Sequence, residues 1–425
     1  MTRSRPRSIV TASALAAATL VGIAATAAPA ALAQDTTLRV AMGSPGEAAI
    51  RVWDDVAKQF ETSHPGVKVE MNYMQDDLYE QIGLQQLLAG RNAPDIYFEW
   101  TGSRMRQRVA DGYAADLTEA AAGPLAPLFD PAVFNAATVD GKVVLVPYSA
   151  DVTNVLWYNK QLLADNGVEP PTTFDELLAA CDKLSAAGII PIASGNKDLW
   201  AAGNWFSHMA SRVVGEDVYD QTLAGNGKFD TPDWETAFGY IAQLRDHKCV
   251  NDSANAIDDN EGAQLFFQGK AAMHMIGSWL VSWAIDEAPQ LDFDFVNLPA
   301  MPDGAKGNQD SVIGVETGYM VNAKSQNIPL AVEFLALLNS PENAQRFIDE
   351  AEIQPLAHST TTAAVDARST RLQELLNNAP AIVLPPDTGY DLKMANALFS
   401  AEAAVLGNQQ SPADALKGID SQLGR

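Results

Sequence analysis

Residues 38–46 read Leu-Arg-Val-Ala-Met-Gly-Ser-Pro-Gly, a short strand followed directly by a turn. Apolar residues at helical spacing follow over 53–60, and the alternating segment 67–71 predicts a second strand. A further helix is expected over 79–88 and a third strand over 95–98. Strands that alternate with helices in this way predict an α/β domain with a mainly parallel sheet.

Three loops of this half are candidates for ligand binding, because ligands of such sheets bind beyond the carboxyl ends of the strands. These loops cover residues 43–47, 75–77 and 99–103. The candidate residues in them are Ser44, Glu47, Gln75, Asp76, Glu99 and Trp100.

The second half of the chain alternates in a similar way. Thr173-Phe-Asp-Glu176 is a capping box that opens a helix, and a short strand is expected over 189–193. Trp234 belongs to another amphipathic helix, and 271–276 is an apolar strand. The chain is too long for one core, and it contains no flexible linker. We therefore expect two domains joined by several crossings of the chain.

The N-terminus has the pattern of a signal peptide. Three arginines precede an uncharged, alanine-rich stretch over 9–30, and Ala31-Leu-Ala33 fits a cleavage site, which predicts a signal peptide over 1–33. An uncleaved membrane anchor is the alternative, because about 20 apolar residues can cross a bilayer. Alanine is only weakly apolar, which favours cleavage. No cysteine lies near the cleavage point, so we expect a soluble protein without a lipid anchor.

The formal net charge is −25, which disfavours nucleic acid and anionic lipid as direct partners. Cys181 and Cys249 are the two cysteines. In an exported protein they can form one disulfide, and two buried free thiols are the alternative. Together with five scattered histidines they form no cluster with metal-ligand spacing, so no metal or other cofactor is expected.

Motifs of catalysis are absent from the sequence: there is no G-x-S-x-G, H-E-x-x-H or P-loop. Glu99 and Glu316 each follow an apolar segment and are the carboxylate pair that a glycoside hydrolase would require. With 53 acidic residues in the chain, such a pair is weak support. Acceptors for ligand hydroxyls, or solvated acids, are the favoured interpretation.

Tryptophans are numerous, and several lie where strands meet loops. Trp53 and Trp234 occur at helical spacing and are expected in the core. The tryptophans at strand–loop boundaries are accompanied by polar side chains, such as Asn204. Flat aromatic faces with a few polar groups suit a concave site for a sugar. These tryptophans are Trp100, Trp200, Trp205 and Trp279.

The order of several motifs resembles the extracellular solute-binding proteins of ABC importers, in particular their large carbohydrate-binding group. The matching segments are Ala93-Pro-Asp-Ile to Trp100, Asp111-Gly-Tyr113, Leu156-Trp-Tyr-Asn-Lys160, Pro171 to Leu177, Phe267-Gln-Gly-Lys-Ala-Ala-Met273, Gly277-Ser-Trp279, Asn297-Leu-Pro299 and Ser340-Pro-Glu342. Together they cover essentially all of the chain that follows the predicted signal peptide.

The resemblance implies two α/β lobes joined by a hinge of crossing segments, each lobe a mainly parallel sheet flanked by helices, with the ligand in the cleft between them. The N-terminal lobe would comprise 34–147 plus 298–334, and the C-terminal lobe 148–297 plus 335–425. The full set of expected ligand-binding residues is Ser44, Glu47, Gln75, Asp76, Glu99, Trp100, Asp151, Trp200, Asn204, Trp205, Trp279, Gly314, Glu316 and Tyr390.

The function that the resemblance implies is capture of a mono- or oligosaccharide and its delivery to an ABC permease, without turnover. We expect a periplasmic monomer. An insertion at Glu99 departs from the maltodextrin binders, so the identity of the sugar is not transferred. The alternatives are a binding protein for an amino sugar, a polyol or a glycerol phosphoester and, less favoured, a secreted glycoside hydrolase.

Overall fold

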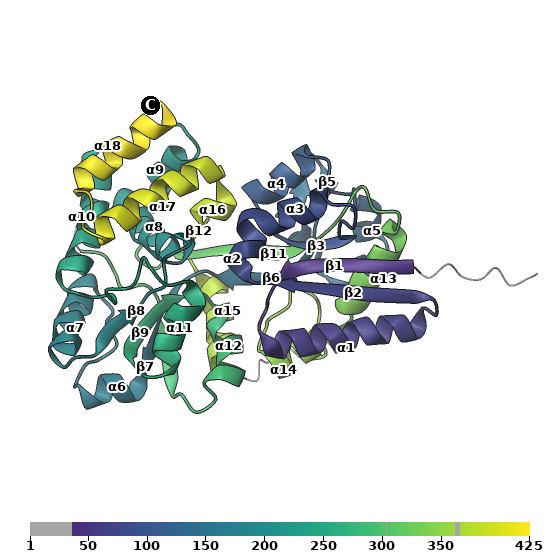
Figure 1. Cartoon of the computed structure of the whole chain (residues 1–425), viewed down its shortest axis with the longest axis horizontal. Helices are drawn as coiled ribbons and strands as arrows, with labels where there is room; N and C mark the ends of the chain where they lie inside the picture. The colour runs from purple at the N-terminus through teal and green to yellow at the C-terminus, as the bar shows by residue number, and fades with distance from the viewer. Residues whose placement is uncertain (1–35, 303, 362–365) are drawn as a thin grey trace, which may run out of the picture. The chain divides into compact units, whose positions relative to one another are not determined.

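The computed structural model describes residues 36–302, 304–361 and 366–425, and the predicted signal peptide lies outside them. Six strands form the first sheet, in which β1 pairs in parallel with β2 and β3, while β11 pairs antiparallel with β3 and β6 (Figure 1). Their bounds are β1 Thr36–Gly43, β2 Val67–Met74, β3 Ile96–Trp100, β6 Val146–Val152, β11 Val312–Val321 and β12 Ile382–Val383.

Helices cover this sheet and bury their apolar faces against it. α1 (Glu47–Ser63) lies alongside β1 and β2, and its Trp53 has no exposed surface, as its helical spacing predicted (Figure 1). The Trp53 ring contacts four aromatic rings at centroid distances of 4.9–6.3 Å: Tyr148, Tyr319, Phe334 and Phe347. The last two come from α13 (Ile328–Leu338) and α14 (Pro341–Ala351), so both helices share this core.

The other elements of this part are short. They are α2 Asp76–Leu78, the π-helix η1 Tyr79–Gly83, α3 Leu84–Ala89, α4 Ser103–Ala110, α5 Thr118–Ala122, the 3₁₀ helices η2 Ala126–Leu128 and η3 Pro131–Phe134, and the paired strands β4 Thr138–Val139 and β5 Lys142–Val143.

The second sheet differs from the expected parallel arrangement. Its order is β10-β7-β9-β8, and among the described residues only β8 and β9 pair in parallel. The strand β7 starts just after β6 ends, whereas β9 ends close to that point, so the two strands run in opposite directions. The bounds are β7 Val155–Asn159, β8 Ile190–Ala193, β9 Ala271–Ile276 and β10 Phe293–Val296.

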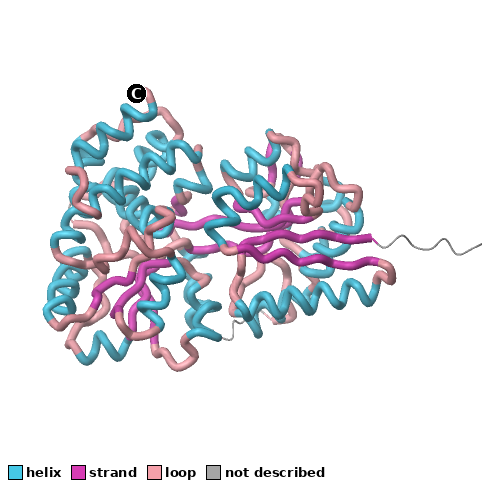
Figure 2. The backbone as a smooth tube through the Cα atoms, viewed as in Figure 1, coloured by secondary structure: helices cyan, strands magenta, loops and turns pink. Residues whose placement is uncertain are grey.

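A second set of helices packs around this sheet, as the cyan segments of Figure 2 show. The capping box at Thr173 and Glu176 is formed, and Trp234 is fully buried, both as predicted. The bounds are α6 Lys160–Asp165, α7 Phe174–Ala186, α8 Trp200–Val214, α9 Glu216–Leu223, α10 Pro232–Asp246, α11 Asp259–Phe267, α12 Leu280–Glu287, α15 Ala367–Asn378, α16 Pro386–Gly389, α17 Leu392–Leu406 and α18 Pro412–Leu423.

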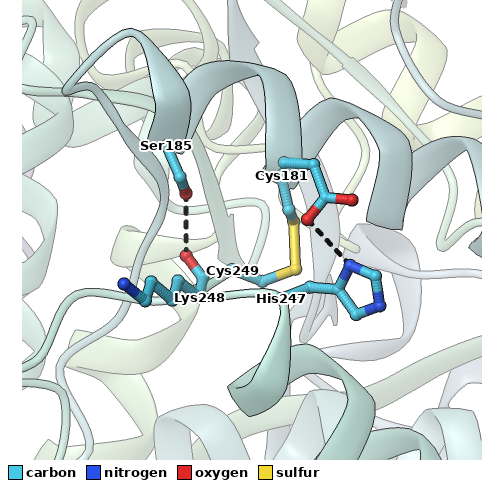
Figure 3. Close-up of a disulfide and its surroundings, with 6 residues drawn as sticks. Cys181, Ser185, His247, Lys248 and Cys249 are labelled. Carbon is cyan, nitrogen blue, oxygen red and sulfur yellow. Dashed lines mark hydrogen bonds and ion pairs between the residues drawn. A yellow bond between two sulfur atoms is a disulfide. The ribbon is translucent and has the colours of Figure 1, made fainter.

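A disulfide joins Cys181 of α7 to Cys249, which follows α10, with the two Cα atoms 4.9 Å apart (Figure 3). Both residues are fully buried. The neighbouring backbone is fixed by a hydrogen bond from Ser185 Oγ to the carbonyl oxygen of Lys248, at 3.3 Å. The disulfide therefore ties two helices of one hydrophobic core.

The helix α8 holds the segments through which the chain passes between the two sheets. Arg212 donates to the carbonyl oxygens of Leu298 and Ser311, at 2.6 and 2.7 Å. His208, one helical turn earlier, contacts Asn154 Oδ1 and the Ser311 carbonyl oxygen, both at 3.1 Å. Burial, together with the nearby Arg212, holds the pKa of His208 well below its usual value, so the imidazole is neutral.

In the part of the chain that the structure describes, no helix is long and apolar enough to cross a membrane. Within the same residues, no group of three or more His, Cys, Asp or Glu side chains is arranged to hold a metal ion.

Candidate functional site

A large cavity lies where strands of both sheets end. Its volume is about 1420 Å³, including the space that is open to solvent. The first sheet contributes the residues that follow β1 and the end of β3, which is where the strand–loop pattern placed the ligand loops. The second sheet contributes the first turn of α8 and the segment that follows β9.

Four tryptophans line this cavity, all of them half-buried: Trp100, Trp200, Trp279 and Trp283. The other four tryptophans of the chain are buried in the cores. The rings of Trp200 and Trp279 are 6.0 Å apart at an interplanar angle of 49°. Gly277 allows the Trp279 ring to lie against the backbone, because a Cβ atom at residue 277 would come within 2.1 Å of that ring.

The position of Trp200 depends on how α8 begins. Leu199 precedes the helix with a φ of 72°, a left-handed conformation that is unfavourable for a residue with a branched side chain. Trp200 and Asn204 are then one helical turn apart, and both line the cavity. Strain of this kind persists where the surrounding packing holds it and often accompanies a binding site.

Asp151 lies near the end of β6, where the chain passes from the first sheet to the second. Ser278 Oγ and Ser149 Oγ donate to its carboxylate at 3.2 and 3.4 Å. Burial raises the pKa of Asp151 to about 6, and these two hydrogen bonds oppose the shift. Near neutral pH the carboxylate is therefore mostly ionised and can accept hydrogen bonds from a ligand.

A second acidic region surrounds Trp100. Glu80 pairs with Arg104 at 3.1 Å, and the Arg104 guanidinium also lies 4.7 Å from the centroid of the Trp100 ring. Burial raises the pKa of Glu80 to about 8 and that of Asp387 to about 6, although Arg104 lowers both. Asp387 and Asp76 contribute further to the shift at Glu80.

Several buried polar atoms of the cavity residues have no hydrogen-bond partner among the residues that the structure describes. Such atoms are costly unless a ligand or water satisfies them. They are Tyr148 Oη, Asn204 Oδ1, Ser282 Oγ, Gln354 Nε2 and Asp387 Oδ1.

Half of the residues expected from sequence to bind ligand come together in this cavity: Ser44, Asp76, Trp100, Asp151, Trp200, Asn204 and Trp279. The structure does not place the other half among the residues that line it: Glu47, Gln75, Glu99, Trp205, Gly314, Glu316 and Tyr390.

Glu99 lies behind the cavity wall and is completely buried. Its carboxylate pairs with Arg108 Nε at 2.7 Å and with Arg104 Nε at 3.5 Å. Successive side chains along a strand point to opposite faces of the sheet. Glu99 precedes Trp100 directly, so it points away from the face on which Trp100 meets the cavity. Glu99 is therefore committed to a structural ion-pair network.

Trp205 is fully buried in the core of the second sheet, and the prediction that it lies at a strand–loop boundary is wrong. It lies inside α8, five residues after Trp200, so the helix directs the two rings to different sides. Tyr390 lies at the end of α16, where its hydroxyl donates to Asp220. Both aromatic side chains therefore stabilise the second group of helices.

The remaining four expected residues do not line the cavity. Glu47 is exposed at the start of α1, and Gln75 is the exposed N-cap of α2, accepting from Leu78 N at 3.0 Å. Gly314 allows β11 to approach β6, since a Cβ atom there would lie 2.8 Å from the Asp151 carbonyl oxygen. Glu316, on the same strand, is half-buried, and burial raises its pKa.

Other residues that line the cavity lie outside the predicted site. These residues are Glu80, Tyr148, Ser149, Ser282, Trp283, Glu352, Gln354, Gln373 and Asp387. Trp283 could have been found, because it follows Trp279 by four residues and so shares one face of a helix. The segments 352–354 and 369–376 carry no motif, and only the tertiary fold brings them to the cavity.

Comparison with known proteins agrees with this architecture. A family profile described as bacterial extracellular solute-binding protein matches residues 44–345. An uncharacterized ABC transporter extracellular-binding protein of Pyrococcus horikoshii is 24% identical over 301 residues, covering 69% of this chain and 66% of the relative, less than two thirds of its length. A probable sugar-binding periplasmic protein of Mesorhizobium japonicum is 24% identical over 357 residues, covering 80% and 77% of the two chains.

Solved structures share the fold at low sequence identity. One, described under xylan utilization by the thermophilic bacterium Caldanaerobius polysaccharolyticus, superimposes with a TM-score of 0.84 at 23% identity, covering 91% of this chain and 100% of the other. A chitin oligosaccharide binding protein gives a TM-score of 0.81 at 20% identity, covering 92% and 99%. The two-lobed α/β fold and the profile that matches most of the sequence agree, and the chain belongs to the bacterial extracellular solute-binding protein family.

Proposed function

We propose that this protein binds a mono- or oligosaccharide in the cavity and delivers it to the permease of an ABC importer. The observation that carries the proposal is the composition of the cavity wall. Four half-buried tryptophans offer flat faces to a sugar ring, and five buried polar atoms among the lining residues have no hydrogen-bond partner in the described part of the chain. A ring of hydroxyl groups can satisfy such atoms while its C–H faces contact the tryptophans.

The names of relatives support a sugar rather than another solute. The Mesorhizobium japonicum relative is named as a probable sugar-binding protein, and the structural neighbour with a TM-score of 0.81 is named for chitin oligosaccharides. Among the described residues that line the cavity there is no lysine, arginine or histidine. This disfavours a glycerol phosphoester, which would need a cation to pair with its phosphate.

The contacts of Glu99 disfavour a glycoside hydrolase. Glu99, one of the two carboxylates that such an enzyme would use, is paired with two arginines and does not line the cavity. We propose that the ligand leaves the protein chemically unchanged, and that the protein acts as a periplasmic monomer after removal of the signal peptide.

We propose that binding is coupled to closure of two lobes, with the expected bounds 34–147 plus 298–334 and 148–297 plus 335–425. The packing of Phe347 and Ala344 with Trp53 favours moving residues 335–351 to the first lobe. Contacts on two sides of the cavity would hold the closed form. Arg51 pairs with Asp286 at 3.2 Å, and Arg106 donates to the Gly389 carbonyl oxygen at 3.3 Å.

The test is a binding screen with protein that has been unfolded and refolded to remove any ligand acquired during expression. Mono- and disaccharides, polyols and glycerol phosphoesters are compared by thermal shift and by tryptophan fluorescence. A ligand at 100 times its dissociation constant stabilises the native state by about 2.7 kcal/mol. Stabilisation by one group of sugars, with a parallel fluorescence change, is the expected result. A response to phosphoesters alone would overturn the proposal.

A further inference from the structure

The helix α12 presents three different faces to its surroundings. Val281 and Ala284 are buried in a core of the second sheet, and Trp283 lines the cavity. The third face, at Ile285 and Asp286, contacts the first turns of α1, beside which α12 lies (Figure 1). One short helix therefore connects the second core, the cavity and a helix of the first core.

The contact at Ile285 is apolar. Its half-buried side chain packs against a cluster of three alanines, which are Ala48 and Ala49 at the start of α1 and Ala351 at the end of α14. Each alanine is at most 1% exposed, and Ile353 packs against the same cluster. Both α1 and α14 contribute to the core of the first sheet. This small apolar cluster therefore joins the two halves of the molecule.

An ion pair lies beside this cluster. Arg51, one helical turn after Ala48, donates from Nη1 and Nη2 to the two carboxylate oxygens of Asp286, at 3.2 and 3.3 Å. The two side chains are 55% and 37% exposed, and an exposed ion pair contributes little free energy. The pair fixes how the two helices are aligned, whereas the apolar contact of Ile285 supplies most of the attraction.

Trp283 connects this contact to the cavity. Its ring lies against Gly46, the N-cap of α1, since a Cβ atom at residue 46 would come within 3.2 Å of Trp283 Cδ1. Trp279, the N-cap of α12, also lines the cavity. A ligand that contacts either tryptophan therefore contacts the helix that packs against α1.

We propose that Ile285 and Asp286 are positioning residues, which hold α12 against α1 in the closed form and so set the affinity for every ligand of the cavity. Neither is among the described residues that line the cavity. The proposal rests on the sugar-receptor function and the lobe closure proposed above. The contact is the same whichever ligand is bound, so it changes the population of the closed form without discriminating between ligands.

The test measures Ile285→Ala against wild type, both refolded, with glucose, galactose, xylose, maltose, cellobiose and xylobiose. Calorimetry gives the affinities, and stopped-flow tryptophan fluorescence gives the dissociation rates. For each sugar that the wild type binds, we expect the affinity to fall about fivefold, or about 1 kcal/mol, in line with half-burial of an isoleucine. The loss should appear as faster dissociation, and the ratios between sugars should stay constant.

Asp286→Asn should lower the same affinities only about twofold, and the loss should disappear at high salt. Two matched controls should change neither affinity nor dissociation rate. Val218→Ala shortens a 44% exposed aliphatic side chain of α9, and Asp246→Asn removes the exposed carboxylate that pairs with Arg245. Urea unfolding without sugar verifies that each variant is folded.

The outcomes separate the two proposals. If the wild type binds sugars and Ile285→Ala leaves their dissociation rates unchanged, the positioning role is overturned and the sugar receptor stands. The same holds if Ile285→Ala lowers the free energy of unfolding without faster dissociation, which would make Ile285 a purely structural residue. A changed ratio between sugars would show that Ile285 acts on the ligand directly and would also overturn the role. No binding of any sugar by the wild type would overturn the receptor itself.

Discussion

Replacing Glu99 by glutamine removes the carboxylate that two buried arginines share. Glu99 has no exposed surface, and the side chains of Arg104 and Arg108 are 4% and 10% exposed. The variant keeps the shape of the side chain but leaves the Arg108 guanidinium with a neutral partner. Removing one member of a buried ion pair costs about 3–5 kcal/mol, because the other charge stays buried without compensation.

We expect a loss near the lower end of that range, about 3 kcal/mol. Arg104 keeps Glu80 at 3.1 Å, and Arg108 keeps Gln85 at 2.8 Å, so neither guanidinium loses every partner. The chain also supplies a matched control. Arg346 Nε and Glu350 Oε1 are 2.7 Å apart, the same separation as Arg108 Nε and Glu99 Oε2, but their side chains are 32% and 44% exposed.

Glu350→Gln should therefore change the free energy of unfolding by no more than about 0.5 kcal/mol, since exposed ion pairs contribute little. The assay is urea unfolding followed by circular dichroism for the wild type and both variants, with ligand affinity measured by tryptophan fluorescence. Equal stability losses in the two variants would refute the argument from burial. A loss of affinity in Glu99→Gln without a loss of stability would show that Glu99 contacts the ligand.

Three further predictions concern the cavity and the second core. Trp279→Ala should lower sugar affinity about tenfold, in line with the loss of one aromatic contact, whereas Trp234→Ala should cost about 3–5 kcal/mol of stability as a large core truncation. Calorimetry measures the affinity and urea unfolding measures the stability. A loss of stability in Trp279→Ala and of affinity in Trp234→Ala would contradict the assignment. The pKa of Asp151 is raised to about 6 in the folded protein, so its stabilising contribution is complete below its unfolded value of 3.8 and is lost as pH rises through 6. The stability of Asp151→Asn relative to wild type should therefore increase by up to about 3 kcal/mol between pH 3.5 and pH 7.5, and a constant difference in urea midpoints would refute this. Replacing both Cys181 and Cys249 by alanine should cost about 4 kcal/mol, because the bridge closes a loop of 68 residues; unchanged urea unfolding would show that the bridge is absent or makes no net contribution.

The residues of the first sheet and its main helix were predictable because their pattern is local. Alternating or apolar runs fixed β1, β2 and β3, and helical spacing placed Trp53 on the buried face of α1. Trp100 and Trp279 could be assigned to the cavity for the same reason, since Trp100 ends an apolar strand and Trp279 follows one closely, and both strand ends lie at the ligand edge of a sheet.

Glu99 shows what such patterns cannot decide. It adjoins Trp100, but the alternation of side chains along a strand and the arginines of α4 determine that its carboxylate is buried. Trp205 is a similar case, because one helix carries it into a core while Trp200, five residues earlier, lines the cavity. In both cases the deciding contact comes from another element.

The sequence by itself determined the α/β class, the two-part organisation, the family and the strand ends that face the ligand, because periodicity, turns and caps act over a few residues. Only the tertiary structure decided the antiparallel direction of most of the second sheet, the approach of residues 352–354 and 369–376, and the meeting of Asn204 with Asp387. Those features depend on which distant elements share a boundary, and no local pattern of residues records that.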